Sequence, residues 1–219
     1  SPAFIQPRAS LYRSTTNTLL VASEGTDTLV ELDAWNVDPS SQSLAIYSVS
    51  GAPTGIALNA DETVAYVFCR STHQLVAVAL HRYDEAEVAA ELERQRKNDA
   101  VSAEQLKKLE RGEPLADDAP YETAPSPILS TRSLADDPLG EQGARGRQFF
   151  YAADDEHMSD GFACAGCHPE GRDDGHVWHE SEYMLHAFAF ENMGDRFVGT
   201  PRQTPMLAGR VAAKGPYGW

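Results

Sequence analysis

The chain has 219 residues, 42% hydrophobic and 23% charged, which is the composition of a folded globular protein of one or two domains. Its 18 Lys and Arg residues oppose 33 Asp and Glu residues, so the formal net charge is −15. This charge repels phosphate backbones and anionic headgroups, which argues against nucleic acid and membrane surfaces as partners. The longest apolar run, residues 75–80, is far shorter than the roughly 20 residues of a membrane helix, so no membrane span is expected.

Residues 19–80 carry short alternating apolar segments separated by polar turns, a pattern that predicts β-hairpins. One predicted hairpin covers residues 19–32 and the other residues 65–78, and the two align in register at an offset of 46 residues. With the intervening Pro53-Thr54-Gly55-Ile56-Ala57 strand, the stretch resembles YVTN or lactonase-like β-propeller repeats. The resemblance implies partial propeller blades that other chain segments or subunits complete. The alternative is an unrelated antiparallel sheet.

Residues 84–127 are expected to form a helical insertion followed by a Pro-rich linker. A first helix is predicted over residues 84–97, from Val88 and Leu92 at i, i+4 spacing. A second, short helix is predicted to start at Ser102 and to end before Gly112. We interpret this charged stretch as a solvated insertion rather than a docking arm.

The sequence Cys164-Ala-Gly-Cys167-His168 carries the strongest chemical signal. A Cys-x-x-Cys pair is found in zinc sites, in dithiol redox sites and in haem c attachment sequences, and a directly following His favours haem c. In that reading both thiols bind the haem covalently and His168 ligates the iron. Zinc stays open as an alternative because His176 and His179 could add ligands. The Gly161-Phe-Ala lead-in and the following Pro argue against a thioredoxin-like pair.

Residues 139–219 also contain an ordered set of short motifs around this pentapeptide. They are Gly146-Arg147-x-Phe149-Phe150, Met158-Ser159, Cys164-Ala-Gly-Cys167-His168-Pro169, Arg202-x-Thr204-Pro205-x-Leu207 and Pro216-Tyr217-x-Trp219. The set resembles the bacterial di-haem cytochrome c peroxidase superfamily, including its MauG-like members. The resemblance implies thioether bonds at Cys164 and Cys167, His168 as proximal ligand, and Arg202 and Trp219 near the porphyrin edge.

Two departures from that superfamily bear on the expectation. Its members carry two haem motifs and this chain carries one. The last motif also breaks off at Trp219, so we expect the natural polypeptide to continue beyond it.

The sixth iron ligand stays open, with a residue beyond Trp219 as the leading hypothesis. The candidates within the chain are Met158, Met184, Met193, Met206, His157, His176, His179 and His186. Ca²⁺ is a further cofactor to consider, at Asp154 with Asp155 or at Asp173 with Asp174, although turn-forming aspartates explain both pairs more simply. Cys69 is expected to be an inert strand cysteine.

The expected fold class is therefore a multi-domain α and β protein. It comprises partial β-propeller blades over residues 1–83, the helical insertion and linker over 84–127, and a mostly α-helical cytochrome c-type domain over 128–219. The expected function is that of an exported, periplasmic or extracellular haem c redox protein that transfers electrons and could carry out peroxidase-like chemistry. One alternative is a propeller-based binding module whose haem only relays electrons, and a second is a zinc-binding structural protein. The acidic charge suits a basic redox partner.

Overall fold

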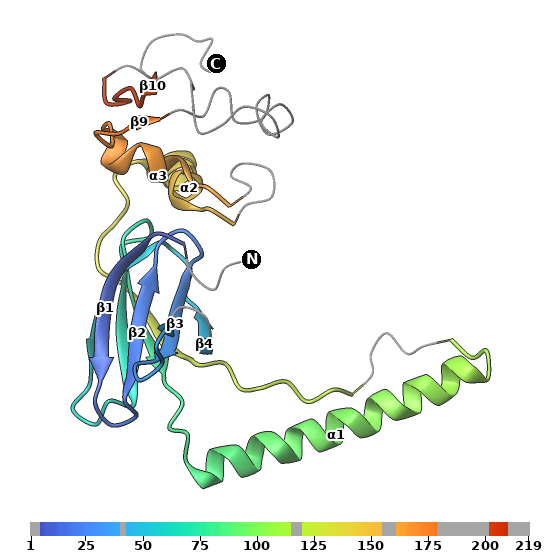
Figure 1. Cartoon of the computed structure of the whole chain (residues 1–219). Coiled ribbons are helices and arrows are strands. Elements are labelled where there is room, and N and C mark those ends of the chain that lie inside the picture. Colours follow the sequence, from blue (N-terminus) through green and yellow to red (C-terminus); the bar gives the residue numbers. More distant parts are fainter. Residues whose placement is uncertain (1–4, 40–42, 115–119, 155–160, 179–201, 210–219) are drawn as a thin grey trace, which may run out of the picture.

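The computed structural model describes residues 5–39, 43–114, 120–154, 161–178 and 202–209, and these are mostly β-structure (Figure 1). Two four-stranded antiparallel sheets have the strand orders β1-β2-β3-β4 and β5-β6-β7-β8. The strands of the first sheet are β1 (Pro7–Arg13), β2 (Thr18–Ser23), β3 (Thr28–Asp33) and β4 (Ser43–Ser48). Those of the second are β5 (Pro53–Leu58), β6 (Val64–Cys69), β7 (Gln74–Ala79) and β8 (Ile128–Ser133).

The two sheets share one hydrophobic core between them. Along β6 the side chains alternate, with Ala65, Val67 and Cys69 fully buried and Tyr66 and Phe68 exposed, as expected for a strand with one face on the core. The core cluster combines side chains from both sheets, namely Leu20, Leu29, Tyr47, Val49, Ala65, Val67, Cys69, Val76, Val78 and Leu80. The alternating pattern in the sequence therefore reports the packing of sheet against sheet.

The two predicted hairpins and their repeat are confirmed. The first hairpin is β2 paired with β3, and the second is β6 paired with β7, both antiparallel and without a register shift. Each strand from β5 to β7 starts 46 residues after its counterpart from β1 to β3. The fourth strand breaks this spacing because the insertion precedes β8.

The expected fold class is wrong. Within the described residues, the strands of the N-terminal part form two complete sheets on a common core, not partial propeller blades. The described residues beyond 128 do not form a mostly helical domain either. They contain β8, the 12-residue helix α2 (Gly140–Tyr151), the four-residue α3 (Cys164–Cys167), one short 3₁₀ turn (Pro169–Gly171) and the two-residue strands β9 (Val177–Trp178) and β10 (Arg202–Gln203). Residues 128–133 form a strand that pairs with β7, so they complete the second sheet instead of opening a helical domain.

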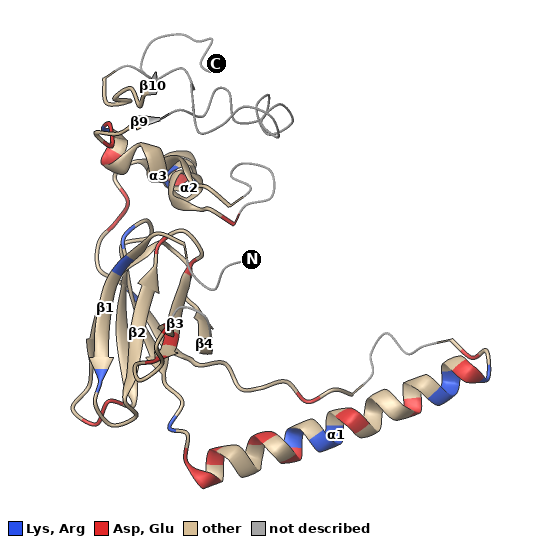
Figure 2. Cartoon of the chain, viewed as in Figure 1, with Lys and Arg blue, Asp and Glu red and all other residues tan. Residues whose placement is uncertain are grey.

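The insertion is one helix rather than the two that were expected. Helix α1 (Glu85–Glu110) runs without interruption through Ser102, and none of its residues is buried. The Asp84 side chain caps its start by accepting a hydrogen bond from the Glu87 amide at 2.8 Å. Figure 2 shows that both acidic and basic residues occur along the helix, which extends away from the sheets. No helix in the described part of the chain is both long enough and apolar enough to cross a membrane.

Helices α2 and α3 lie beyond one end of the two sheets, where the β2–β3 and β6–β7 turns meet (Figure 1). The Ala153 amide, just after α2, donates a hydrogen bond of 2.7 Å to the carbonyl of Gly25 in the first turn. The Arg147 side chain in α2 donates two hydrogen bonds, of 3.0 and 2.6 Å, to the carbonyl of Ser71 in the second turn. These contacts attach the segment that contains the Cys-x-x-Cys-His motif to the end of the sheets.

Candidate functional site

The Cys-x-x-Cys-His motif forms a single helical turn, α3, which contacts helix α2. The amide of His168 donates a hydrogen bond of 2.9 Å to the carbonyl of Cys164, which closes the turn. Residues three apart on a helix lie on the same side, so the turn places both thiols on one side. Cys164 is exposed, Cys167 is half-buried, and neither forms a disulfide.

The two residues between the cysteines are small because they pack against the body of the protein. Ala165 is 3% exposed and lies in a small cluster with Ala52 and Tyr151. A Cβ atom at Gly166 would lie 2.8 Å from Nε2 of Gln6 and 3.1 Å from Cζ of Phe162, so a larger residue would require these two side chains to move. One side of the turn is therefore fixed on the protein, while the thiol of Cys164 is on the exposed side.

His168 ends the turn and is itself half-buried. Its Nδ1 atom is buried and has no hydrogen-bond partner among the described residues. Pro169 and Glu170 follow in a short 3₁₀ turn, where Glu170 has a positive φ of 56°. The backbone thus holds the imidazole of His168 close to the second thiol, and one ring nitrogen has no partner within the residues that the structure describes.

A network of charges connects this turn to both sheets. Glu24, which is fully buried, forms ion pairs with Arg8 and with Arg70, the latter at 3.1 Å. Arg70 also pairs with Glu170, and its guanidinium lies 4.5 Å from the centroid of the Tyr151 ring. The hydrogen bond from Arg70 lowers the pKa of Glu170 below its usual value.

The internal repeat relates the two residues at the centre of this network. Glu24 and Arg70 are separated by 46 residues, so they occupy equivalent positions at the ends of β2 and β6. The first hairpin supplies the buried carboxylate, and the second supplies the cation that reaches Glu170, just after the Cys-x-x-Cys-His motif. Neither residue belongs to a motif that would predict its role, and only the alignment of the hairpins could have drawn attention to them.

The other residues expected near a haem are brought together only in part. Arg202 lies in β10, where its backbone pairs with Trp178, and Trp219 lies outside the described residues. Among the candidate sixth ligands, Met206 and His176 are described and exposed. The remaining candidates lie outside the described residues, namely Met158, Met184, Met193, His157, His179 and His186.

The aspartate pairs considered for Ca²⁺ act as turn residues where they are described. Asp173 accepts a hydrogen bond from the amide of Gly175 at 3.2 Å, and Asp174 accepts one from the amide of His176 at 2.9 Å. Asp154 is exposed, and its neighbour Asp155 is outside the described residues. In the part of the chain that the structure describes, no three His, Cys, Asp or Glu side chains are grouped to hold a metal ion.

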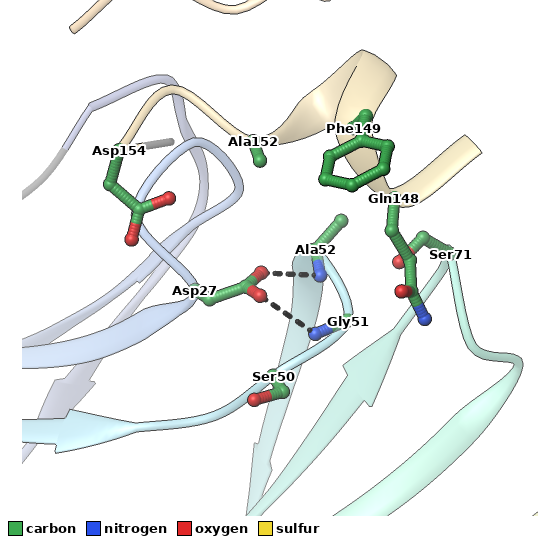
Figure 3. A pocket seen from close by; sticks show the side chains of 9 residues that line it. All are labelled: Asp27, Ser50, Gly51, Ala52, Ser71, Gln148, Phe149, Ala152 and Asp154. Carbon is green, nitrogen blue, oxygen red and sulfur yellow. Dashed lines mark hydrogen bonds between the residues drawn. The ribbon is translucent and has the colours of Figure 1, made fainter. Parts of the chain in front are cut away.

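A separate pocket of about 400 Å³ lies between the ends of the sheets and α2 (Figure 3). Its described lining consists of Asp27, Ser50, Gly51, Ala52, Ser71, Gln148, Phe149, Ala152 and Asp154. The Asp27 carboxylate accepts hydrogen bonds from the amides of Ala52 at 2.7 Å and Gly51 at 3.2 Å. Burial raises the pKa of Asp27, and the negative charge of Asp154 raises it further. The sequence did not predict this pocket, because its turn residues carry no recognisable motif and nothing in the sequence places them beside Gln148 and Phe149 of α2.

Comparisons of the chain with protein-family models, with curated proteins and with solved structures find no match. The similarity to the di-haem cytochrome c peroxidase superfamily therefore stays a prediction from the motifs.

Proposed function

We propose that this chain is a c-type haem protein that transfers electrons, with Cys164 and Cys167 as the haem-binding thiols and His168 as an axial ligand. The observation that carries the proposal is the turn formed by residues 164–168. It presents two thiols, neither in a disulfide, on one side, followed directly by an imidazole whose buried Nδ1 has no hydrogen-bond partner in the described part of the chain. These residue types at this spacing are those required for covalent haem attachment.

The residues present fit a haem c group. Cys164 is exposed and accessible to a reactive vinyl group, while Ala165 and Gly166 pack inward and leave the thiol side of the turn unobstructed by their own side chains. When bound, haem c supplies an iron centre that exchanges single electrons. A ligating His usually donates a hydrogen bond from its second ring nitrogen. The buried Nδ1 of His168 would take such a partner from a residue outside the described part or from water.

The protein body holds the ligating turn in place. Arg70 connects Glu170, two residues after His168, to the fully buried Glu24. In the ion pair between Arg70 and Glu24, the Glu24 side chain is fully buried and shielded from water. This pair therefore restrains the turn more strongly than a fully exposed pair would. The expected role of this network is to keep the imidazole in one orientation toward the iron.

The charge of the chain supports a basic redox partner. A net charge of −15 steers positively charged proteins toward it, at a rate that falls as salt is added. With a covalent haem, the proposal places the protein in the periplasm or outside the cell. The resemblance leaves peroxidase-like turnover open as a second activity, which the experiment below separates from electron transfer.

The experiment is maturation of the full chain in a bacterial host that attaches haem c, followed by a reduced pyridine haemochrome spectrum and intact mass. We expect one haem per chain, and its loss in Cys164→Ser, Cys167→Ser and their double variant. Cys69→Ala, which alters a buried cysteine in β6, is the matched control and should retain haem. His168→Ala should alter the Soret band and the potential while leaving the covalent haem attached.

Three outcomes decide between the hypotheses. Unmodified thiols in the matured protein, or stoichiometric zinc in their place, would overturn the haem assignment. Reversible reduction without consumption of hydrogen peroxide would assign electron transfer alone. Steady consumption of peroxide with a reduced carrier protein would assign peroxidase chemistry to the same group.

A further inference from the structure

We propose that the pocket between the sheet ends and α2 binds a small organic ammonium ion, with its charge at Asp27 and Asp154 and its alkyl part against Phe149. This pocket is separate from the haem-motif turn, because none of its described lining residues belongs to residues 164–168. The inference does not depend on the proposed redox function.

The charge of the pocket favours a cation. Two carboxylates, Asp27 and Asp154, line it, and its described lining contains no Lys, Arg or His. Figure 3 shows Asp27 rising from the β2–β3 turn and Asp154 on the segment that follows α2. The raised pKa of Asp27 reflects its burial and the negative charge of Asp154. A bound cation would stabilise the charged form of both carboxylates and so offset the cost of these two effects.

A buried hydroxyl without a partner gives independent support. Ser71 is 1% exposed, and its Oγ atom has no hydrogen-bond partner among the described residues, although buried hydroxyls normally have one. Figure 3 shows this hydroxyl turned from the β6–β7 turn toward the pocket. The carbonyl of Ser71 accepts two hydrogen bonds from Arg147, which fix the residue in this position. An ammonium group carries several N–H donors and can satisfy a hydroxyl and a carboxylate together.

The size and the remaining lining select an organic ion rather than a bare metal ion. A volume of about 400 Å³ lies near the lower end of the range for small-molecule sites, roughly 300 to 1,000 Å³. Phe149, Ala52 and Ala152 provide apolar surface beside the polar groups. A ligand with a charged head and a short alkyl chain matches both halves of this lining.

At Gly51 the pocket wall leaves no room for a side chain. Its φ is +108°, and a Cβ atom there would lie 2.4 Å from Oγ1 of Thr72. The Asp27 carboxylate holds the amides of Gly51 and Ala52 in this conformation. One wall of the pocket is thus preorganised by the same carboxylate that we assign to the ligand, so binding requires little rearrangement there.

The test is isothermal titration calorimetry of the full chain with n-butylammonium chloride at fixed ionic strength. Asp154→Asn and Ser71→Ala remove one proposed contact each without touching the amides held by Asp27. We expect Asp154→Asn to weaken binding about tenfold, the size of one hydrogen bond to a charged group, and Ser71→Ala about fivefold. Asp61→Asn is the matched control. It removes the same charge from the β5–β6 turn, outside the pocket lining, and should leave the affinity unchanged.

Titrations with n-butanol and with calcium chloride complete the design. Neither should bind with an affinity near that of the ammonium ion. The proposal is overturned if butylammonium gives no saturable heat, if butanol binds equally well, or if calcium binds more tightly than the ammonium ion. Equal affinities in Asp154→Asn, Ser71→Ala and Asp61→Asn would also overturn it, because they would show that only the overall charge attracts the ion.

Discussion

A buried ion pair between Arg13 and Glu31 allows a sharp test of how the first sheet is stabilised. The two side chains are 1% and 0% exposed, and Nη1 of Arg13 lies 2.9 Å from Oε1 of Glu31. Glu31 also accepts hydrogen bonds from the hydroxyls of Thr18 at 2.6 Å, Tyr47 at 3.1 Å and Tyr83 at 3.1 Å. Arg13 donates further hydrogen bonds to two backbone carbonyls. Removal of one charged partner would therefore leave the charge of the other buried and without a counter-charge.

We expect Glu31→Gln to lower the free energy of unfolding by about 3 kcal/mol or more, because it leaves the Arg13 charge buried without a counter-charge. Arg13→Met should cost about 3 kcal/mol for the converse reason, since three hydroxyl donors only partly compensate the Glu31 carboxylate. The double variant removes both charges. Its cost should therefore fall short of the sum of the single costs by about 2 kcal/mol.

The assay is urea unfolding followed by circular dichroism, with the slope of the transition compared between variants. Arg96→Met is the control, because Arg96 pairs with Glu93 on the exposed helix α1 and its loss should leave the transition unchanged. Additivity of the two single costs within about 0.5 kcal/mol would refute the reasoning. So would single costs below about 1 kcal/mol, since they would mean that water reaches the pair.

Three further predictions concern a thiol, a turn and the insertion. Burial and the nearby Asp27 raise the pKa of the Cys69 thiol to about 12. Iodoacetamide at pH 8 should therefore label the exposed Cys164 of the haem-free protein and leave Cys69 unlabelled, as read from peptide mass spectra. Equal labelling of the two cysteines would contradict this prediction. Gly51→Ala should lower the urea midpoint, at a cost of about 2 kcal/mol, through its positive φ and the contact with Thr72, whereas Gly112→Ala, with nothing within 4 Å, should cost only about 1 kcal/mol. Replacing α1 by a short flexible linker should raise stability by about 1 kcal/mol, because the helix buries nothing and a shorter loop costs less entropy; a lower urea midpoint would count against that view.

The strands could be predicted because buried apolar residues alternate with exposed ones along them. Ala65, Val67 and Cys69 face the core while Tyr66 and Phe68 do not, and this period of two is visible in the sequence. The polar turns then fixed the hairpins. What the sequence did not reveal is that each hairpin belongs to a complete four-stranded sheet, because the last strand of the second sheet follows a long insertion.

The insertion was predicted as two helices because the first pattern ends at residue 97 and Ser102 favours the start of a second helix in isolated sequences. In the structure the side chains of Asn98 and Ser102 contact the chain that returns along α1. Asn98 exchanges two hydrogen bonds with the backbone of Glu122, at 2.9 and 2.7 Å, and Ser102 lies 3.4 Å from the hydroxyl of Tyr121. Tertiary contacts satisfy these side chains, so they do not compete with the helix backbone.

The candidate site was predictable only where chemistry imposes a spacing. Cys164, Cys167 and His168 stand out because haem attachment requires them together. Arg70 and Glu170, which hold this segment against the sheets, are 100 residues apart and carry no motif. Asp27 and Ser71 likewise meet at one pocket only because two turns from separate sheets end side by side.

The late position of β8 has a consequence for how the polypeptide is made. During synthesis β7 emerges from the ribosome before residues 80–127, and its outer edge stays without a partner until β8 follows. An apolar strand with an open edge is a template for association with other chains. Translation that pauses within the insertion would prolong this exposure, so codon usage along α1 should influence the soluble yield more than the stability of the finished protein.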